Sequence, residues 1–117
     1  MLPRAGRLRK KREFEQVYQQ GRRVSMESFT MYVHARGDDA PTRFGFVVGR
    51  RFGTHVQRNR VKRRLRAAAR GLWENLPAGY DVVCVARSAA VTAPIELIQR
   101  EMTRALAQAG FHTGGEA

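Results

Sequence analysis

The first half of the chain opens with the hydrophobic pattern of a short helix. Apolar side chains recur at helical spacing between residues 11 and 20, with Phe14 and Tyr18 among them. Gly21 follows directly and suits the left-handed conformation that often ends a helix. We therefore expect a helix over 11–20.

Strands are expected after this helix. Residues 29–35 alternate between apolar and polar side chains, and Tyr32 falls on the polar face. A turn-forming cluster at 37–41 precedes a returning strand over 43–49, and a weaker strand is expected over 22–26. The pattern thus predicts three strands before the middle of the chain.

The second half reads as helix, strand and helix. Residues 54–57 fit a capping box, in which a Thr and a Gln side chain satisfy unpaired backbone N–H groups. Apolar positions then recur every three or four residues and predict a helix over 55–75. The apolar run at 80–86 is typical of a strand covered on both faces, and Pro94 starts a last helix. The order α-β-β-β-α-β-α predicts one α+β domain with a four-stranded sheet packed against helices.

Length and the ends of the chain set the expected boundaries. The chain has 117 residues, which suits a single domain. Residues 1–10 are basic and almost devoid of apolar side chains, so we expect a mobile basic arm there. The folded domain is expected over 11–110, and residues 111–117 are expected to form a flexible tail.

Charge indicates the kind of partner. The chain has 22 Lys and Arg against 10 Asp and Glu, a formal net charge of +12. Self-repulsion of this size works against a compact chain unless a polyanion neutralises it. An acidic protein, an anionic membrane and a nucleic acid could each do so. Between Ala40 and Trp73 there are ten Arg or Lys and no acid, and this concentration favours a nucleic acid.

The cations gather on one side of the long expected helix. Asn59, Arg63, Arg66 and Arg70 lie opposite its apolar stripe, where arginines suit bidentate contacts with phosphates. A solvated helix face normally mixes both signs of charge, whereas this one has no carboxylate before Glu74. The other candidate contacts are Arg60 and Lys62 beside this row, Arg58 on the apolar side near the helix start, and Arg50 and Arg51 in the preceding loop.

Protein-borne catalysis is not indicated. The single cysteine, Cys84, lies in an apolar strand and is interpreted as a small buried side chain. The three histidines are scattered, and the sequence shows no metal-ligand spacing, phosphate loop or nucleophile motif. No apolar run is long enough to span a membrane, and the basic N-terminus lacks the apolar stretch of a signal peptide. We therefore expect a cytoplasmic protein without a metal site or catalytic residues of its own.

Residues 58–66, which read RNRVKRRLR, resemble the Arg-Asn-Arg signature of the bacterial ribonuclease P protein subunit. That family reads R-N-R-hydrophobic-K-R-x-hydrophobic-R on this helix. One departure precedes the signature, since Gly49 stands where the family usually has Ser. Further similarity, within a span from about Arg9 to Leu106, is found at residues 14–18, 29–32, 46–48 and 80–87.

The resemblance implies a fold and a function. The fold would be like the second domain of a small-subunit ribosomal protein, with a left-handed β-α-β crossover through the signature helix. The protein would be a noncatalytic subunit that assists a catalytic RNA in removing the 5′ leader of precursor tRNA. Mg²⁺ would be bound mainly by that RNA, and neither a membrane nor another protein partner would be required.

The resemblance also implies roles for single residues. A cleft between the first helix and the sheet would hold the single-stranded leader through Phe14, Tyr18 and Tyr32. Base stacking on Tyr32 agrees with its place on the polar face of a strand, and core packing is the competing interpretation for all three aromatics. The contacts with the catalytic RNA would come from Arg58, Asn59, Arg60, Lys62, Arg63 and Arg66.

Two other functions fit the charge. A ribosomal or other structural RNA-binding protein of the same fold would explain the cations but not a stacking cleft. A sequence-specific DNA-binding protein would place the basic helix in a major groove, but no helix-turn-helix pair precedes it. The resemblance therefore favours an accessory subunit of an endoribonuclease, a hydrolase that acts in tRNA processing.

Overall fold

The computed structural model describes residues 4–110, so the first three residues and the expected tail at 111–117 lie outside the described part. The helices are α1 (Lys11–Gln20), α2 (His55–Trp73) and α3 (Ile95–Gln108), and the strands are β1 (Arg22–Ser25), β2 (Phe29–Ala35), β3 (Arg43–Val47) and β4 (Tyr80–Ala86). Short 3-10 turns precede the helices: η1 (Arg4–Gly6), η2 (Arg50–Phe52) and η3 (Ser88–Val91). The expected order of elements and the α+β class are confirmed. The ends of α2 and β3 each lie two residues before the predicted ones.

The four strands form one mixed sheet in the order β1-β2-β4-β3. β4 therefore lies in the interior, antiparallel to β2 on one side and parallel to β3 on the other. The register places Tyr32 opposite Val83, and Val83 opposite Gly45. These three residues form a row across the sheet on one of its faces.

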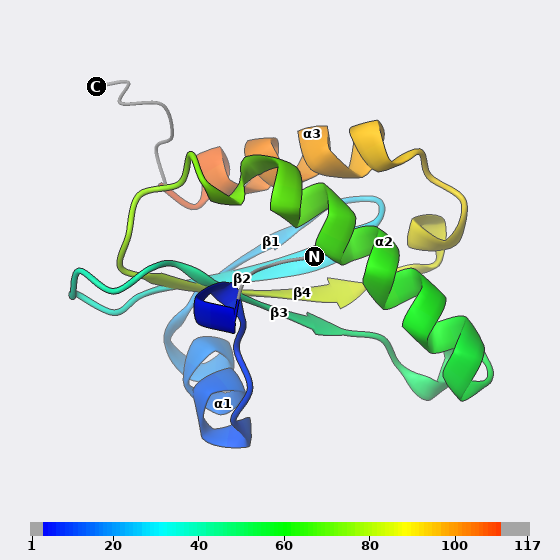
Figure 1. Cartoon of the computed structure of the whole chain (residues 1–117), viewed down its shortest axis with the longest axis horizontal. Coiled ribbons are helices and arrows are strands. Elements are labelled where there is room, and N and C mark those ends of the chain that lie inside the picture. Colours follow the sequence, from blue (N-terminus) through cyan, green and yellow to red (C-terminus); the bar gives the residue numbers. More distant parts are fainter. Residues whose placement is uncertain (1–3, 111–117) are drawn as a thin grey trace.

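The helices cover the two faces of the sheet unequally. α2 and α3 lie together over one face, and α1 crosses the other (Figure 1). Phe29, Met31 and Val33 of β2 are buried on the α2 and α3 side, which explains the alternation along that strand. The opposite face packs a smaller core around Leu8, Val17 and Val83. Because α1 is short, this second face is only partly covered.

The connection from β3 through α2 to β4 is the left-handed crossover that the family resemblance implies. Both strands run to the right in Figure 1, α2 returns above the sheet, and β4 lies behind β3. Right-handed crossovers are the general rule for parallel strands, so this connection is an exception. It places the long helix diagonally across the sheet.

Capping explains where α2 begins, and burial explains which of its sides faces the sheet. The Thr54 hydroxyl accepts a hydrogen bond from the Gln57 backbone N–H (3.2 Å), and the Gln57 side chain accepts one from the Thr54 N–H (2.7 Å). The predicted capping box is therefore present. Val61 and Leu65 are buried on the side that faces the sheet, which leaves the opposite side of α2 to solvent.

The N-terminal segment differs from the expected mobile arm in its described part. Leu8 is buried, its N–H donates to the Phe44 carbonyl (2.9 Å), and Arg7 forms a parallel bridge with the same residue. The physical reason is Leu8 itself, a single apolar side chain in a basic segment. The folded unit thus includes residues 4–10.

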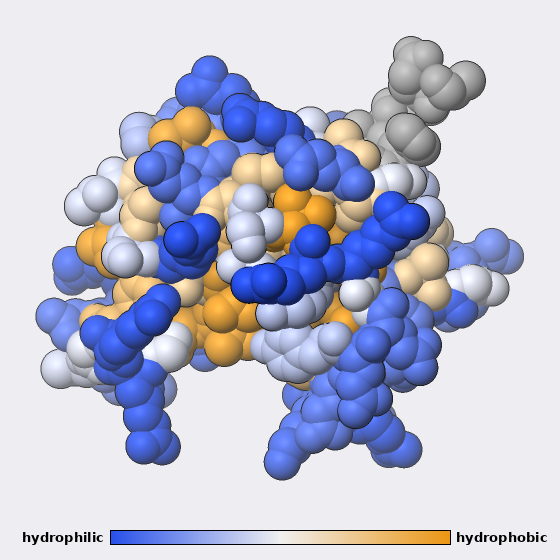
Figure 2. Space-filling view, turned by 180° about the vertical axis from the view of Figure 1, so that it is seen from behind, coloured by the Kyte–Doolittle hydropathy of each residue, from blue (hydrophilic) through white to orange (hydrophobic). Residues whose placement is uncertain are grey.

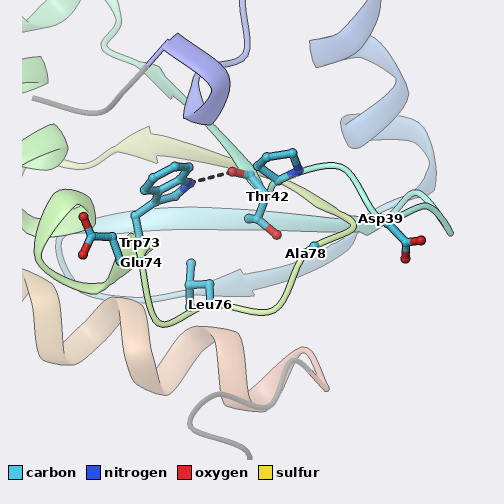
Figure 3. A pocket seen from close by; sticks show the side chains of 7 residues that line it. Asp39, Thr42, Trp73, Glu74, Leu76 and Ala78 are labelled. Carbon is cyan, nitrogen blue, oxygen red and sulfur yellow. Dashed lines mark hydrogen bonds between the residues drawn. The ribbon is translucent and has the colours of Figure 1, made fainter.

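Trp73 packs against the N-terminal segment and connects it to the rest of the fold. A side chain at Gly6 would lie 2.7 Å from the Trp73 ring, so only glycine fits that close an approach. The indole N–H of Trp73 donates to the Thr42 carbonyl (2.7 Å), across one wall of a hollow of about 260 Å³ (Figure 3). The end of α2, the approach to β3 and η1 therefore meet at one tryptophan.

Candidate nucleic-acid interface

The solvent-facing side of α2 carries cations without acidic partners. Arg60, Arg63 and Arg70 are exposed, and within the described residues none of the candidate cations of α2 forms an ion pair with a carboxylate. The remaining candidates on this helix are half-buried: Arg58, Asn59, Lys62 and Arg66. The helix thus presents an unneutralised row of donors, as its sequence predicted.

The turn before α2 adds two more cations near the helix start. Arg50 and Arg51 are exposed in η2, and the Arg51 guanidinium lies 5.5 Å from the centre of the Phe52 ring. Gly53 follows with φ of 111°, a conformation that favours glycine. The chain therefore turns sharply into α2 and keeps both arginines next to its first turn.

Arg64 has a different task from its neighbours. Its Nε donates to the Ala90 carbonyl (3.1 Å) and its Nη2 donates to the Ala93 carbonyl. The side chain therefore ties α2 to the segment between β4 and α3. Sequence reasoning left Arg64 without a role, because the helical pattern does not reveal an unpaired carbonyl in a distant loop.

Two tyrosines meet on the other face of the sheet. The rings of Tyr18 on α1 and Tyr32 on β2 lie 4.9 Å apart and nearly perpendicular. Burial and the neighbouring Tyr32 raise the pKa of Tyr18, yet 40% of its surface is exposed. Both side chains are thus partly open to a ligand.

Phe14 lies at the opposite end of the same side of α1. A Cβ at Gly45 would stand 2.5 Å from the Phe14 ring and 3.2 Å from Leu8. Phe14 is half-buried and packs against the second core. The structure therefore brings the three predicted aromatics to one face, with Phe14 more engaged in packing than Tyr18.

An apolar surface continues beyond α1 along this face. Thr30, Val47 and Val85 are half-buried at the ends of their strands, past the row that α1 covers. In Figure 2 apolar surface is visible along the lower side of the molecule, between the hydrophilic projections of α1 and of the start of α2. We call this surface, with Tyr18 and Tyr32, the aromatic face. The sequence analysis missed Val47 and Val85, although strand alternation could have placed them there.

An ionic network holds the other side of α1. Arg43 donates to both oxygens of the buried Asp81 (2.8 Å each) and to Glu13 (2.9 Å), while Arg36 also donates to Asp81. Burial favours a higher pKa for Glu13, but backbone hydrogen bonds from Lys10 and Arg9 and the charge of Arg43 outweigh it, so its pKa is lowered. The network fixes the start of α1 over β3 and β4.

Over residues 4–110, no three His, Cys, Asp or Glu side chains lie together as metal ligands would. None of the helices within these residues combines the length and the hydropathy that a membrane span requires. Burial raises the pKa of the Cys84 thiol well above its usual range, as expected for a cysteine that serves packing.

The fold and its surfaces define a small basic α+β domain, with a cationic helix on one face of the sheet and an open aromatic face on the other. The sequence model of the ribonuclease P family matches residues 2–110. The chain therefore belongs to the ribonuclease P protein family.

Relatives and solved structures agree with this assignment. The ribonuclease P protein component of Symbiobacterium thermophilum is 38% identical over 110 residues, covering 94% of this chain and 96% of the relative. That of Chloroflexus aggregans is 44% identical over 116 residues, covering 98% and 85%. The fold is similar to the RNase P protein of Staphylococcus aureus (TM-score 0.77, 26% identity, 92% and 98% coverage). It is also similar to that of Thermotoga maritima (TM-score 0.75, 27% identity, 87% and 96% coverage).

Proposed function

We propose that this chain is the protein subunit of a ribonuclease P holoenzyme, which removes the 5′ leader of precursor tRNA to form the mature 5′ end. The observation that carries the proposal is the pairing of an unneutralised cationic helix with an open aromatic face on one small family member. The cations suit an RNA backbone, and the aromatics suit unpaired bases. The protein supplies positioning and neutralisation, and the catalytic centre belongs to the RNA.

The cationic side of α2 is the proposed contact with the catalytic RNA. Arg60, Arg63 and Arg70 are exposed and without carboxylate partners among the described residues, so no internal ion pair must break before a phosphate binds. Guanidinium groups form bidentate hydrogen bonds with phosphates. Arg50 and Arg51 extend the same surface beyond the first turn of the helix.

The aromatic face is the proposed binding surface for the leader. Tyr32 is half-buried on a strand, and the Tyr18 ring lies 4.9 Å away and nearly perpendicular to it. Stacking of an unpaired base on such a ring contributes about 1–3 kcal/mol and tolerates any base. A single strand laid across this face would also contact the apolar surface of Val47 and Val85.

Mg²⁺ is proposed to be bound mainly by the RNA. In the described part of the chain, Asp38 and Asp81 both pair with Arg36, and Glu13 pairs with Arg43. These carboxylates are therefore already used within the fold. The contribution of the protein would be to reduce phosphate repulsion, so that less Mg²⁺ is needed. We place this activity in the cytoplasm, with no further protein partner.

Reconstitution tests the proposal. The purified chain is mixed with a bacterial ribonuclease P RNA and a 5′-labelled precursor tRNA at a Mg²⁺ concentration at which the RNA alone is slow. We expect release of the leader at the mature 5′ end and tighter binding of precursor than of mature tRNA. No stimulation at low Mg²⁺ would contradict the proposed function. Equal affinity for both tRNA forms would contradict the role of the aromatic face.

A further inference from the structure

A hollow at the N-terminal end of α1 is lined mainly by cations. It has a volume of about 310 Å³ and lies between the docked N-terminal segment, the first turn of α1 and the start of β3. We call it the arm pocket, and its lining residues are Ala5, Arg7, Arg9, Lys10, Glu13 and Arg43. None of the functions described above uses it.

The carboxylate of this pocket, Glu13, already accepts hydrogen bonds at both of its oxygens. One oxygen of Glu13 accepts hydrogen bonds from the backbone N–H groups of Arg9 (3.2 Å) and Lys10 (3.0 Å). The other oxygen accepts from Arg43 Nη1 (2.9 Å). Glu13 therefore shapes the pocket and holds Arg43, but it does not neutralise the three cations of the N-terminal segment.

Those three cations have no acidic partner in the described part of the chain. The side chains of Arg7, Arg9 and Lys10 form no ion pair there. In addition, Arg7 Nε is buried and has no hydrogen-bond partner within the described residues. A buried donor left unpaired is costly to a fold, and an anion in the pocket would remove that cost.

The main chain that carries these side chains is fixed before any ligand arrives. Arg7 bridges to Phe44 on β3, and the neighbouring Leu8 is buried in the second core. Glu13 fixes the turn between this segment and α1 through the backbone of Arg9 and Lys10. Little ordering of the main chain is therefore needed on binding, which favours affinity.

We propose that the arm pocket binds a backbone phosphate of the RNA partner. This inference rests on the proposed function. Two guanidinium groups and an ammonium around one hollow match a tetrahedral oxyanion. RNA is favoured over a free anion because the pocket opens on the surface of a chain with a net charge of +12. The same RNA would approach the other exposed cations.

The pocket is separate from the aromatic face. It lies at Arg43, where β3 begins, whereas the aromatic face reaches Val47, where β3 ends. Four strand residues separate the two positions by about 13 Å, at about 3.3 Å per residue. Glu13 and Phe14 also project on different sides of α1. The pocket and the aromatic face are therefore distinct places on the surface, and we assign the pocket to the catalytic RNA.

Two charge-matched double variants test the proposal. R7Q/R9Q removes two pocket cations and keeps hydrogen-bond donors and the backbone bridge. R100Q/R104Q removes two exposed cations of α3, so both variants lose the same net charge. The dissociation constant for assembly with ribonuclease P RNA is measured at several salt concentrations between about 0.05 and 0.2 M, a range over which phosphate contacts change the affinity strongly.

We expect R7Q/R9Q to weaken assembly roughly tenfold at about 0.1 M salt and to lower the log–log salt slope by about 1, as loss of one phosphate contact predicts. R100Q/R104Q is expected to stay within about twofold of the unchanged chain. Equal behaviour of the two variants would overturn the proposal. Failure of the unchanged chain to bind the RNA would instead contradict the proposed function.

An experiment with inorganic phosphate distinguishes a free oxyanion from an RNA backbone phosphate as the ligand of the arm pocket. Thermal unfolding of the free chain is followed in phosphate and in chloride at equal ionic strength. We expect phosphate to raise the Tm of R100Q/R104Q more than that of R7Q/R9Q, because only the former keeps the arm pocket. If R7Q/R9Q loses this response but keeps its RNA affinity and salt slope, the pocket binds a free oxyanion, and an RNA phosphate is the wrong ligand.

Discussion

Two adjacent arginines of α2 show how position decides the task of a side chain. Arg63 is exposed and has no carboxylate partner among the described residues, whereas Arg64 donates to the carbonyls of Ala90 and Ala93. One residue step rotates the side chain by about 100° around a helix. The same residue type thus faces a partner at one position and a loop of its own chain at the next.

Replacing these two arginines is expected to give opposite results. Arg63→Ala should weaken assembly with ribonuclease P RNA roughly tenfold and leave the Tm within about 2 °C, because it removes a solvent-facing cation. Arg64→Ala should lower the unfolding free energy by about 1–3 kcal/mol, because two carbonyls lose a charged donor. Filter binding and thermal melting measure the two effects. A fall in Tm for Arg63→Ala would show that its exposure has been misjudged.

Tyr32 carries the prediction for the aromatic face. Tyr32→Ala should spare assembly with the catalytic RNA and reduce the preference for precursor over mature tRNA by about 1–3 kcal/mol. Tyr32→Phe keeps the ring and should retain most of that preference. Competition between the two tRNA forms measures it. Loss of assembly in Tyr32→Ala would place Tyr32 in the catalytic RNA interface instead.

At the scale of elements, the two sides of α2 have different roles: one packs against the sheet, and the other bears the candidate RNA contacts. Its sheet-facing side includes Val61 and Leu65, both buried, and its outer side bears the candidate contacts. The core contacts therefore fix the direction in which the cations point. A change in the core would disturb RNA binding only through loss of the fold.

Leu65→Ala tests this division of α2. The side chain is fully buried, so truncation should cost about 2–5 kcal/mol of unfolding free energy. Urea unfolding measures the loss. A comparison with Ala67→Gly on the exposed side separates core packing from helix propensity, which is worth about 1 kcal/mol. An unchanged midpoint for Leu65→Ala would mean that the two sides of α2 are inverted.

The start of α1 carries the pH prediction. The pKa of Glu13 is lowered, so its carboxylate stabilises the fold above its unfolded-state pKa, and this contribution is lost as the pH falls below about 4.5. Because the Glu13 side chain is 23% exposed, solvent screens the ion pair and limits the contribution to about 0.5–1 kcal/mol. Glu13→Gln should flatten this part of the acid unfolding curve. An unchanged curve would mean that Glu13 is not linked to folding.

The elements show which features a sequence can predict. The course of α2 was predictable because apolar spacing and the Thr54 cap are local signals. The docking of residues 4–10 was not, because it depends on contacts with distant segments: the Leu8 N–H pairs with β3 more than thirty residues away, and Gly6 packs against Trp73. The ion-pair network of Asp81 with Arg36 and Arg43 was not predicted for the same reason, since it joins segments that are distant in sequence.

The candidate site also has features that local spacing predicts and features that it does not. The row on α2 followed from helical spacing, and the structure leaves Arg63 and Arg70 exposed but Asn59 and Arg66 half-buried. The grouping of Phe14, Tyr18 and Tyr32 came from the family resemblance, because spacing alone does not show that α1 crosses that face of the sheet. The left-handed crossover also came from the resemblance, and the general preference for right-handed connections would have predicted the opposite.

At the scale of the whole molecule, much of the net charge of +12 is concentrated along the outer side of α2. α2 has 19 residues and is about 28 Å long, within a molecule whose longest extent is 40 Å. A cationic row of that length matches several successive phosphates. The apolar core on the sheet side of α2 keeps this row facing outward.

Salt dependence is the prediction for the whole surface. If six phosphates are contacted, the logarithm of the association constant with RNA should fall with the logarithm of salt concentration, with a slope of about −4 to −5. The double variant R60Q/R63Q should reduce that slope by about 2. Assembly measured at several salt concentrations gives both values. A slope near −1 would mean that most of these cations do not contact RNA.

The interior position of β4 has a consequence for how the chain is made. β2 and β3 are synthesised early but do not pair with each other, because β4 lies between them. Until residues 80–86 have left the ribosome, the sheet cannot close, and α2 has no complete surface to cover. Nascent chains that end before β4 should therefore be open to proteases, and protection should appear in one late step. The RNA would then meet a protein that becomes competent only after β4 has been synthesised.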